Sequence, residues 1–126
     1  MIPADPGTYV LVLHVRRSRR IRIGRLGTFI LPEGHYLYVG SAFGPGGLRA
    51  RIAHHTKRAA CPHWHIDYLR RVARVVAVWY VVGKRLEYVW ARRLIRAQSV
   101  VVPVVGFGAS DCGCRAHLFH SMAMRR

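Results

Sequence analysis

Acidic residues are scarce in this chain. Only five of its 126 residues are Asp or Glu, against 21 that are Lys or Arg, so the formal net charge is +16. Lys57 and Lys84 are the only lysines, which leaves 19 arginines. A guanidinium group grips a phosphate through two parallel hydrogen bonds, whereas an ammonium group acts as a point charge. This composition indicates a nucleic-acid partner; the alternative is a general adaptation such as thermophily or solubility.

Long apolar runs are also absent. The longest, residues 75–82, is far shorter than the roughly 18 to 20 residues of a transmembrane helix, so we expect no membrane partner. The first six residues lack the charged and apolar regions of a signal peptide, and we therefore expect a cytoplasmic protein. Three cysteines in such a chain argue against a framework of disulfides.

The apolar periodicity that is present predicts both strands and helices. We expect strands at residues 8–15, 21–23, 28–31, 35–40, 75–82, 100–105 and 117–120. We expect helices at residues 48–57, 63–72 and 86–98. Grouped strands followed by helices predict one α+β domain over residues 1–126, a small antiparallel sheet flanked by about three helices. The strand at 75–82 is expected in the centre of the sheet, with Trp79 in the core, and Trp90 is expected on the buried face of its helix.

Two short motifs that pair tyrosine with glycine stand on two of the predicted strands. The first is GTY at residues 7–9, and the second is YVG at residues 38–40. The helix that follows carries Arg51 and His55 four residues apart, and Glu87 is the only carboxylate of the third predicted helix. Each tripeptide alone is a weak signal, but their order together with the helix and the glutamate is a strong one for fold.

In this order, the motifs resemble the GIY-YIG nuclease superfamily over roughly residues 7–120. The similarity is greatest to a branch that also carries segments such as HWHIDY at 63–68 and GFGASDC at 106–112. The resemblance implies a metal-dependent endonuclease that hydrolyses phosphodiester bonds in DNA, rather than RNA, in repair or recombination. It implies Mg²⁺ or Mn²⁺ as the cofactor. The alternative is a binding module for nucleic acid that has the same fold and no catalytic activity.

The resemblance also implies roles for single residues. Tyr9 would act as the general base, Tyr38 would orient water or phosphate, and Arg51 would stabilise the charge of the transition state. Glu87 would hold the metal. Because a phenol has an ordinary pKa of about 10, we expect nearby cations to assist Tyr9. His55 is the rival base, since histidine titrates near neutral pH.

Structural interpretations of the same residues remain open. The tyrosines are common in strands and can simply pack the sheet. Arg51 can be one more solvated cation, and Glu87 can form a surface ion pair with Arg85 or Arg92. The isoleucines of the superfamily motifs are replaced by Thr8 and Val39, which we expect to be harmless. The 28 residues between the two tyrosines exceed a simple hairpin and predict an inserted pair of short strands at about 21–31, which could narrow access to the site.

Further residues are expected around this set. The side chains that we expect to contact nucleic acid are Arg25, Arg49, Lys57, Arg58, His63 and His65. The residues that we expect in loops beside the site are Ser41, Ser110 and Asp111.

Two groups of side chains suggest metal binding outside the motifs. His63, His65 and Asp67 alternate, but residues two apart on a helix diverge, so we expect them at the rim of the site or in packing rather than at a separate metal. Cys112, Cys114 and His117 are soft ligands, although zinc normally needs a fourth, for which Cys61 and His120 are candidates. Of the three tryptophans, Trp64 is the one that we expect to stack on a base of the nucleic acid.

Overall fold

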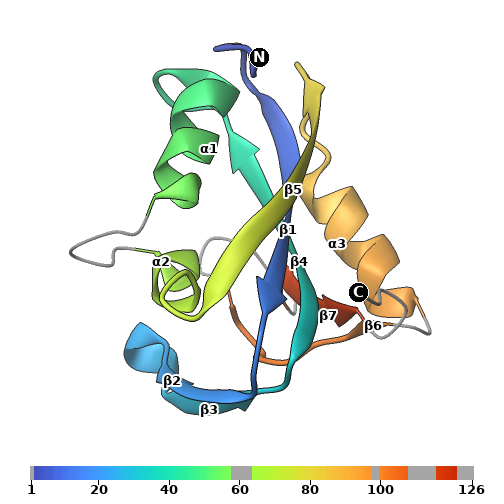
Figure 1. Cartoon of the computed structure of the whole chain (residues 1–126). Helices are drawn as coiled ribbons and strands as arrows, with labels where there is room; N and C mark the ends of the chain where they lie inside the picture. Colours follow the sequence, from blue (N-terminus) through green and yellow to red (C-terminus); the bar gives the residue numbers. More distant parts are fainter. Residues whose placement is uncertain (1, 58–63, 98–99, 108–115, 122–126) are drawn as a thin grey trace.

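The structure is a computed structural model, and it describes residues 2–57, 64–97, 100–107 and 116–121. It confirms an α+β fold, in which an antiparallel sheet is flanked by helices (Figure 1). The elements in chain order are β1 (Gly7–Val15), β2 (Arg19–Arg22), the short 3-10 helix η1 (Gly24–Leu26), β3 (Thr28–Leu31), β4 (Gly34–Ala42), α1 (Gly47–Thr56), α2 (His65–Leu69), β5 (Ala73–Val82), α3 (Glu87–Arg96), β6 (Val100–Val101) and β7 (Leu118–Ser121). None of the described helices is long and apolar enough to cross a membrane.

Strand β1 lies between β5 and β4 in the sheet, whose order is β5-β1-β4-β7-β6. It pairs antiparallel with β4 from Gly7 opposite Ala42 to Val15 opposite Gly34, and with β5 along its other side. Successive side chains of β1 enter two different cores, because strand side chains alternate between faces. This double burial explains why the strand is apolar along almost its whole length.

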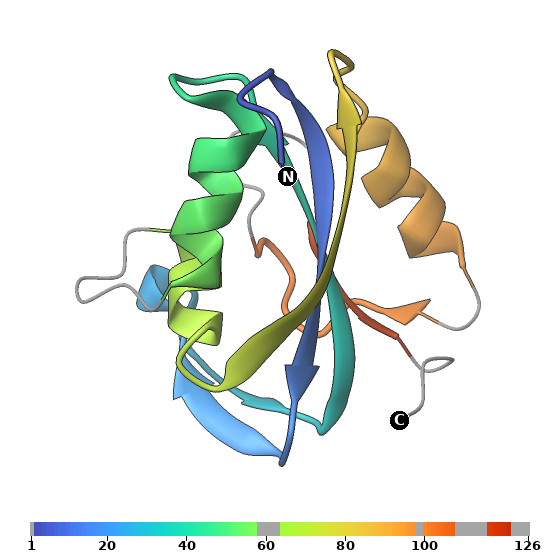
Figure 2. The ribbon, with the colours of Figure 1, turned by 45° about the horizontal axis from the view of Figure 1, so that its top comes forward.

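The two faces of the sheet carry different helices (Figure 2). Tyr9, Leu11 and Leu13 face the core that contains residues of α1 and α2. Val10 and Val12 face the smaller core that contains Ala91 of α3. Trp90 packs against this second core, as its helical position predicts.

The expectation of a central, buried strand at residues 75–82 was wrong. Among the described strands, β5 lies at the edge of the sheet, beside β1. Trp79 is 58% exposed, so its predicted place in the core was also wrong. An edge strand has a neighbour on only one side, and its apolar side chains are covered less completely than those of an inner strand. An apolar run predicts a strand but does not show whether the strand has a neighbour on both sides.

The remaining differences concern the ends of elements. The inserted pair of strands is confirmed as the separate ribbon of β2 and β3, in which Arg19 lies opposite Leu31. The second predicted helix is shorter, because α2 begins at His65 and ends at Leu69, while residue 63 lies outside the described residues. The strand expected at 100–105 ends at Val101, and turns follow it. Pro103 cannot donate a ladder hydrogen bond, which agrees with this early end.

Candidate active site

The two glycines of the motifs stand where a side chain would not fit. Gly40 lies opposite Tyr9, and a Cβ there would come within 2.8 Å of the Cε2 atom of Tyr9 and closer still to its hydroxyl. A Cβ on Gly7 would come within 2.9 Å of the Leu48 side chain and closer to the carbonyl oxygen of Val81. Packing therefore explains both glycines. The one in β4 allows the Tyr9 ring to lie across the neighbouring strand.

Helix α1 brings a histidine against the first tyrosine. The Nε2 atom of His55 lies 2.7 Å from the Tyr9 hydroxyl, and both side chains are buried. The ring of Tyr38 meets the ring of His55 edge to face, at 5.9 Å between centroids. Three of the predicted site residues are thus packed together.

One helical turn earlier, Arg51 is held by two neighbours. Its Nη1 atom donates a hydrogen bond to the carbonyl oxygen of Ser41 at 3.2 Å. Its guanidinium carbon lies 4.5 Å from the centre of the Trp64 ring, a distance typical of a cation–π contact. The contact with Trp64 was not expected, since we assigned this tryptophan to stacking on a base. Arg51 is therefore a fixed charge and not a freely solvated one.

Glu87, the first residue of α3, also belongs to this group. Its side chain is 22% exposed, and its Oε2 atom lies 3.7 Å from Nδ1 of His117. Its charge raises the pKa of both Tyr9 and Tyr38, so the carboxylate is near enough to act on both phenols, although α3 itself packs on the other face of the sheet. Arg85, one of the two expected ion-pair partners, instead lies over the ring of Phe43.

The start of α3 is anchored by Thr8, a residue that we expected to be only a harmless replacement. The buried Thr8 hydroxyl donates a hydrogen bond to the carbonyl oxygen of Lys84 at 2.6 Å. It accepts another from the backbone N–H of Leu86 at 2.9 Å. Because Glu87 follows directly, the middle residue of the GTY motif positions the carboxylate relative to β1.

Burial dominates the ionisation of the two phenols. It raises the pKa of Tyr9 well above 10, with a further rise from Tyr38, and Arg51 offsets only part of this. Burial also raises the pKa of Tyr38, followed by the charge of Glu87. Arg51 thus lowers the pKa of Tyr9 as expected, but burial outweighs this assistance in the free protein. Both phenols carry their protons at neutral pH.

His55 is neutral as well. Burial lowers its pKa to about 3, and the charges of His54 and Arg51 act in the same direction. The argument that this histidine titrates near neutral pH was thus wrong. Its Nδ1 atom is buried without a hydrogen-bond partner among the described residues. In the tautomer that carries its proton on Nδ1, the Nε2 atom can accept the proton of the Tyr9 hydroxyl.

Asp67 joins the site through a contact that the sequence did not reveal. Its Oδ1 atom lies 3.1 Å from Nε2 of His54, and its Oδ2 atom accepts the N–H of Trp64 at the start of α2. His63, which the sequence groups with Asp67, lies outside the described residues. The sequence does contain one signal for this role, since an acidic residue three positions into a helix often caps it.

Two places in the described residues offer ligands for a metal. His54, His55 and Asp67 have ligand atoms within 4.8 Å of one another, a set with two nitrogens that suits zinc better than magnesium. The Nε2 atom of His55 is, however, already in contact with Tyr9. Glu87 presents a partly exposed carboxylate, the hard ligand that Mg²⁺ prefers. Glu87 therefore fits the expected cofactor.

The other predicted residues are exposed, make packing contacts or lie outside the described residues. Arg25 and Lys57 are exposed, and Arg49 is exposed and donates a hydrogen bond from Nε to the carbonyl oxygen of Ile2. The ring of His65 contacts the ring of Phe107 at 5.5 Å. The predicted residues that lie outside the described part of the chain are Arg58, Cys61, His63, Ser110, Asp111, Cys112 and Cys114. His120, a candidate zinc ligand, stacks on the ring of Tyr36.

Comparison with known proteins identifies the family of the chain. The model of a family described as a domain of unknown function, DUF123, matches residues 8–126, which include Tyr9, Tyr38, Arg51, His55 and Glu87. Neither the curated proteins nor the solved structures contain a match to the chain. Because the matched segment covers nearly the whole sequence, the chain belongs to the DUF123 family.

Proposed function

We propose that this protein is a metal-dependent endonuclease that hydrolyses phosphodiester bonds in DNA and acts in the cytoplasm, in repair or recombination. The observation that carries the proposal is the buried contact of the Tyr9 hydroxyl with Nε2 of His55, at 2.7 Å, beside one fixed guanidinium and one carboxylate. Phosphodiester hydrolysis needs an acceptor for a proton of water, positive charge on the phosphate, and help for the leaving oxygen.

Arg51 supplies the positive charge. The Ser41 carbonyl and the Trp64 ring hold its guanidinium in one place, so little reorganisation is needed when a phosphate binds. A fixed donor of this kind stabilises charge that develops on the phosphate oxygens in the transition state. Tyr38, which keeps its proton, can donate a hydrogen bond to the phosphate or to the attacking water.

Tyr9 and His55 together accept the proton of the water. As the water oxygen attacks phosphorus, its proton moves to the Tyr9 oxygen, while the Tyr9 proton moves to Nε2 of His55. The net change is one proton transferred from water to the imidazole. A bound phosphate favours this step, because a nearby negative charge raises the pKa of a histidine. Neither group then needs to be ionised in the free protein.

Glu87 would hold Mg²⁺ or Mn²⁺, and the bound ion would neutralise phosphate charge and assist the leaving oxygen. The contact of Thr8 with the start of α3 keeps the carboxylate in place relative to the phenols. Single-carboxylate sites of this kind are completed by water and substrate oxygens, in agreement with the partial exposure of Glu87.

Cleavage assays on purified protein test the proposal. We expect the protein with Mg²⁺ or Mn²⁺ to nick branched, damaged or single-stranded DNA. Glu87→Gln should slow cutting severely, to a rate that only single-turnover assays measure, and leave the affinity for DNA nearly unchanged. Glu33→Gln is the matched control, because Glu33 is exposed in the turn before β4. A Glu87→Gln protein that cuts as fast as the parent would show that this site is not the catalytic one.

The second candidate function is a module that binds nucleic acid without cutting it. It is favoured by the ionisation of the pair, since burial keeps the Tyr9 phenol protonated and makes the His55 imidazole a weak base. This alternative predicts affinity that falls steeply with salt concentration, and no cleavage with any divalent metal. The same assays distinguish it from the nuclease.

A further inference from the structure

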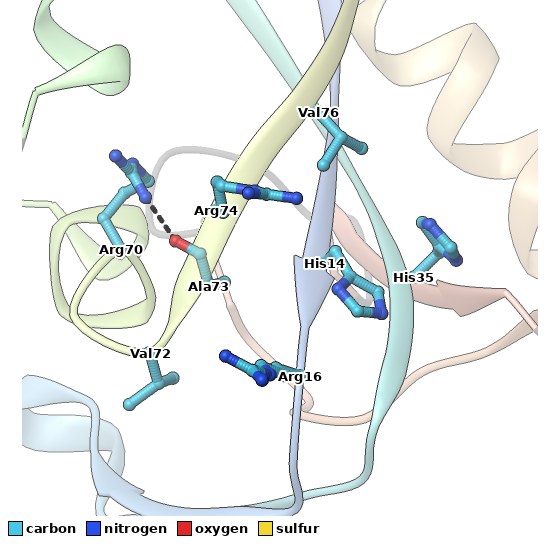
Figure 3. A pocket seen from close by; sticks show the side chains of 8 residues that line it. All are labelled: His14, Arg16, His35, Arg70, Val72, Ala73, Arg74 and Val76. Atoms are coloured by element: carbon cyan, nitrogen blue, oxygen red, sulfur yellow. Dashed lines mark hydrogen bonds between the residues drawn. The ribbon is translucent and has the colours of Figure 1, made fainter. Parts of the chain in front are cut away.

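A basic pocket lies toward the C-terminal end of β1 (Figure 3). It has a volume of about 580 Å³, and no residue of α3 lines it. Five of its eight lining residues are arginine or histidine, and none is acidic. The lining residues are His14, Arg16, His35, Arg70, Val72, Ala73, Arg74 and Val76.

Three of the basic side chains come from directly paired positions on adjacent strands. His14 of β1 lies opposite His35 of β4 on one side and opposite Arg74 of β5 on the other. Directly opposed residues share a face of the sheet, so the three side chains form one row. The two imidazole rings lie 4.7 Å apart. The pairing of the three strands therefore sets the spacing of this row.

The pocket is separate from the candidate active site. His14 lies five positions after Tyr9 along β1, a distance of roughly 17 Å at about 3.4 Å per residue. Because side chains alternate, an odd number of positions also places the two residues on opposite faces of the sheet. Strand β5 is the edge of the described sheet, so a ligand that runs along this edge can contact both faces.

Arg70 links the two regions. It is buried, and its guanidinium donates hydrogen bonds to the carbonyl oxygens of His55 and Thr56 at the end of α1 and of Ala73 at the start of β5. It thereby ties the wall of the pocket to the helix that carries the candidate catalytic histidine. Arg16 and Arg74 are exposed, so they are the cations that a ligand can reach.

The lining defines the chemistry of the ligand. Pockets for drug-sized molecules are lined mainly by apolar side chains with a few polar groups, and this one is lined mainly by cations and imidazoles. Arginine remains charged at all relevant pH values and binds phosphate through paired hydrogen bonds. With no carboxylate in the lining to compete, the pocket suits a phosphate group.

We propose that this pocket binds a backbone phosphate of the DNA whose scissile bond lies at the candidate active site. This inference rests on the proposed function. A duplex rises about 3.4 Å per nucleotide, so the roughly 17 Å along β1 corresponds to at least about five nucleotides between the two contacts, because the DNA must also pass around the edge of the sheet at β5. The DNA is held at two points, and the second contact lies outside the catalytic group.

Paired charge removals test this assignment through binding alone, without metal. Arg16→Ala/Arg74→Ala removes the reachable cations of the pocket, and Arg92→Ala/Arg96→Ala removes the same charge from the exposed face of α3. We expect the pocket variant to lose affinity for DNA several-fold more than the α3 variant. Its slope of log affinity against log salt should be smaller by about 0.9 for each phosphate that the variant no longer neutralises. Thermal unfolding of both variants checks that they fold.

The outcomes separate this inference from the proposed function. Equal losses in both variants, with cleavage by the parent protein retained, overturn the pocket and leave the nuclease in place. A selective loss in the pocket variant of a protein that cuts no DNA supports the pocket and refutes the nuclease. Titration with inorganic phosphate distinguishes a small-anion site: phosphate binding that Arg16→Ala/Arg74→Ala removes, with unchanged DNA affinity, overturns the assignment to DNA.

Discussion

Replacement of Thr8 by valine removes the two hydrogen bonds that hold the start of α3 to β1. The buried hydroxyl is 2.6 Å from the carbonyl oxygen of Lys84 and 2.9 Å from the backbone nitrogen of Leu86. Valine has nearly the same shape and an equally good strand propensity, so the change isolates the hydroxyl. The perturbation acts on the residue next to Glu87 without touching Glu87 itself.

The expected loss of stability follows from the number of bonds. A typical intramolecular hydrogen bond contributes about 0.5–1.5 kcal/mol net, so two such bonds predict that the free energy of unfolding falls by about 1–3 kcal/mol. Urea denaturation with linear extrapolation measures this loss. Because the carboxylate of Glu87 would be less well positioned, we also expect a slower rate of single-turnover DNA cleavage at nearly unchanged DNA affinity.

Two variants serve as controls. Thr8→Ser keeps the hydroxyl and should retain most of the cleavage rate, whereas Thr28→Val alters an exposed threonine of β3 and should change neither property. The reasoning is refuted if Thr8→Val unfolds at the same urea concentration as the parent and cleaves DNA at the same rate.

Two further predictions concern the packing and the ionisation of the same group. Gly40→Ala should lower the free energy of unfolding by about 1–3 kcal/mol, because its Cβ would overlap Tyr9. Gly44→Ala is the control, because a Cβ there meets nothing within 4 Å, and it should leave stability unchanged. Equal urea midpoints for the two variants would contradict this prediction. The imidazole of His55 has a pKa of about 3 in the folded protein and about 6.5 when unfolded, so its contribution to stability is complete above pH 6.5 and is lost as pH falls toward 3. His55→Gln should flatten the decrease in unfolding free energy between pH 6.5 and 4, and an unchanged slope argues against a buried neutral ring.

The residues that the structure brings together were mostly predictable from motif order. Tyr9 and Tyr38 stand on strands that periodicity identifies, and the pairing of β1 with β4 places their side chains on one face. Arg51 and His55 are four residues apart on a helix, a spacing that puts both on one side. Local patterns of this kind are reliable, because the periods of strands and helices determine which side chains share a face.

Contacts between distant positions that no motif marks were not predictable. The bonds of the Thr8 hydroxyl span 76 and 78 residues, and no local pattern marks a threonine for such a role. The ionisation of Tyr9 and His55 was also missed, because their pKa values depend on burial, which the count of arginines does not reveal. Composition described the charge of the whole chain correctly and the environment of this pair incorrectly.

The account depends on separate side chains acting as one catalytic unit, and a double-mutant cycle on single-turnover cleavage tests this most directly. Tyr9→Phe removes the hydroxyl that contacts His55, and Glu87→Gln removes the carboxylate proposed to hold the metal. When residues act as a unit, the second change adds little to the first. We predict that the double variant cleaves DNA about as slowly as the slower single variant. Losses that multiply, or a Tyr9→Phe variant as fast as the parent, would contradict the proposed site.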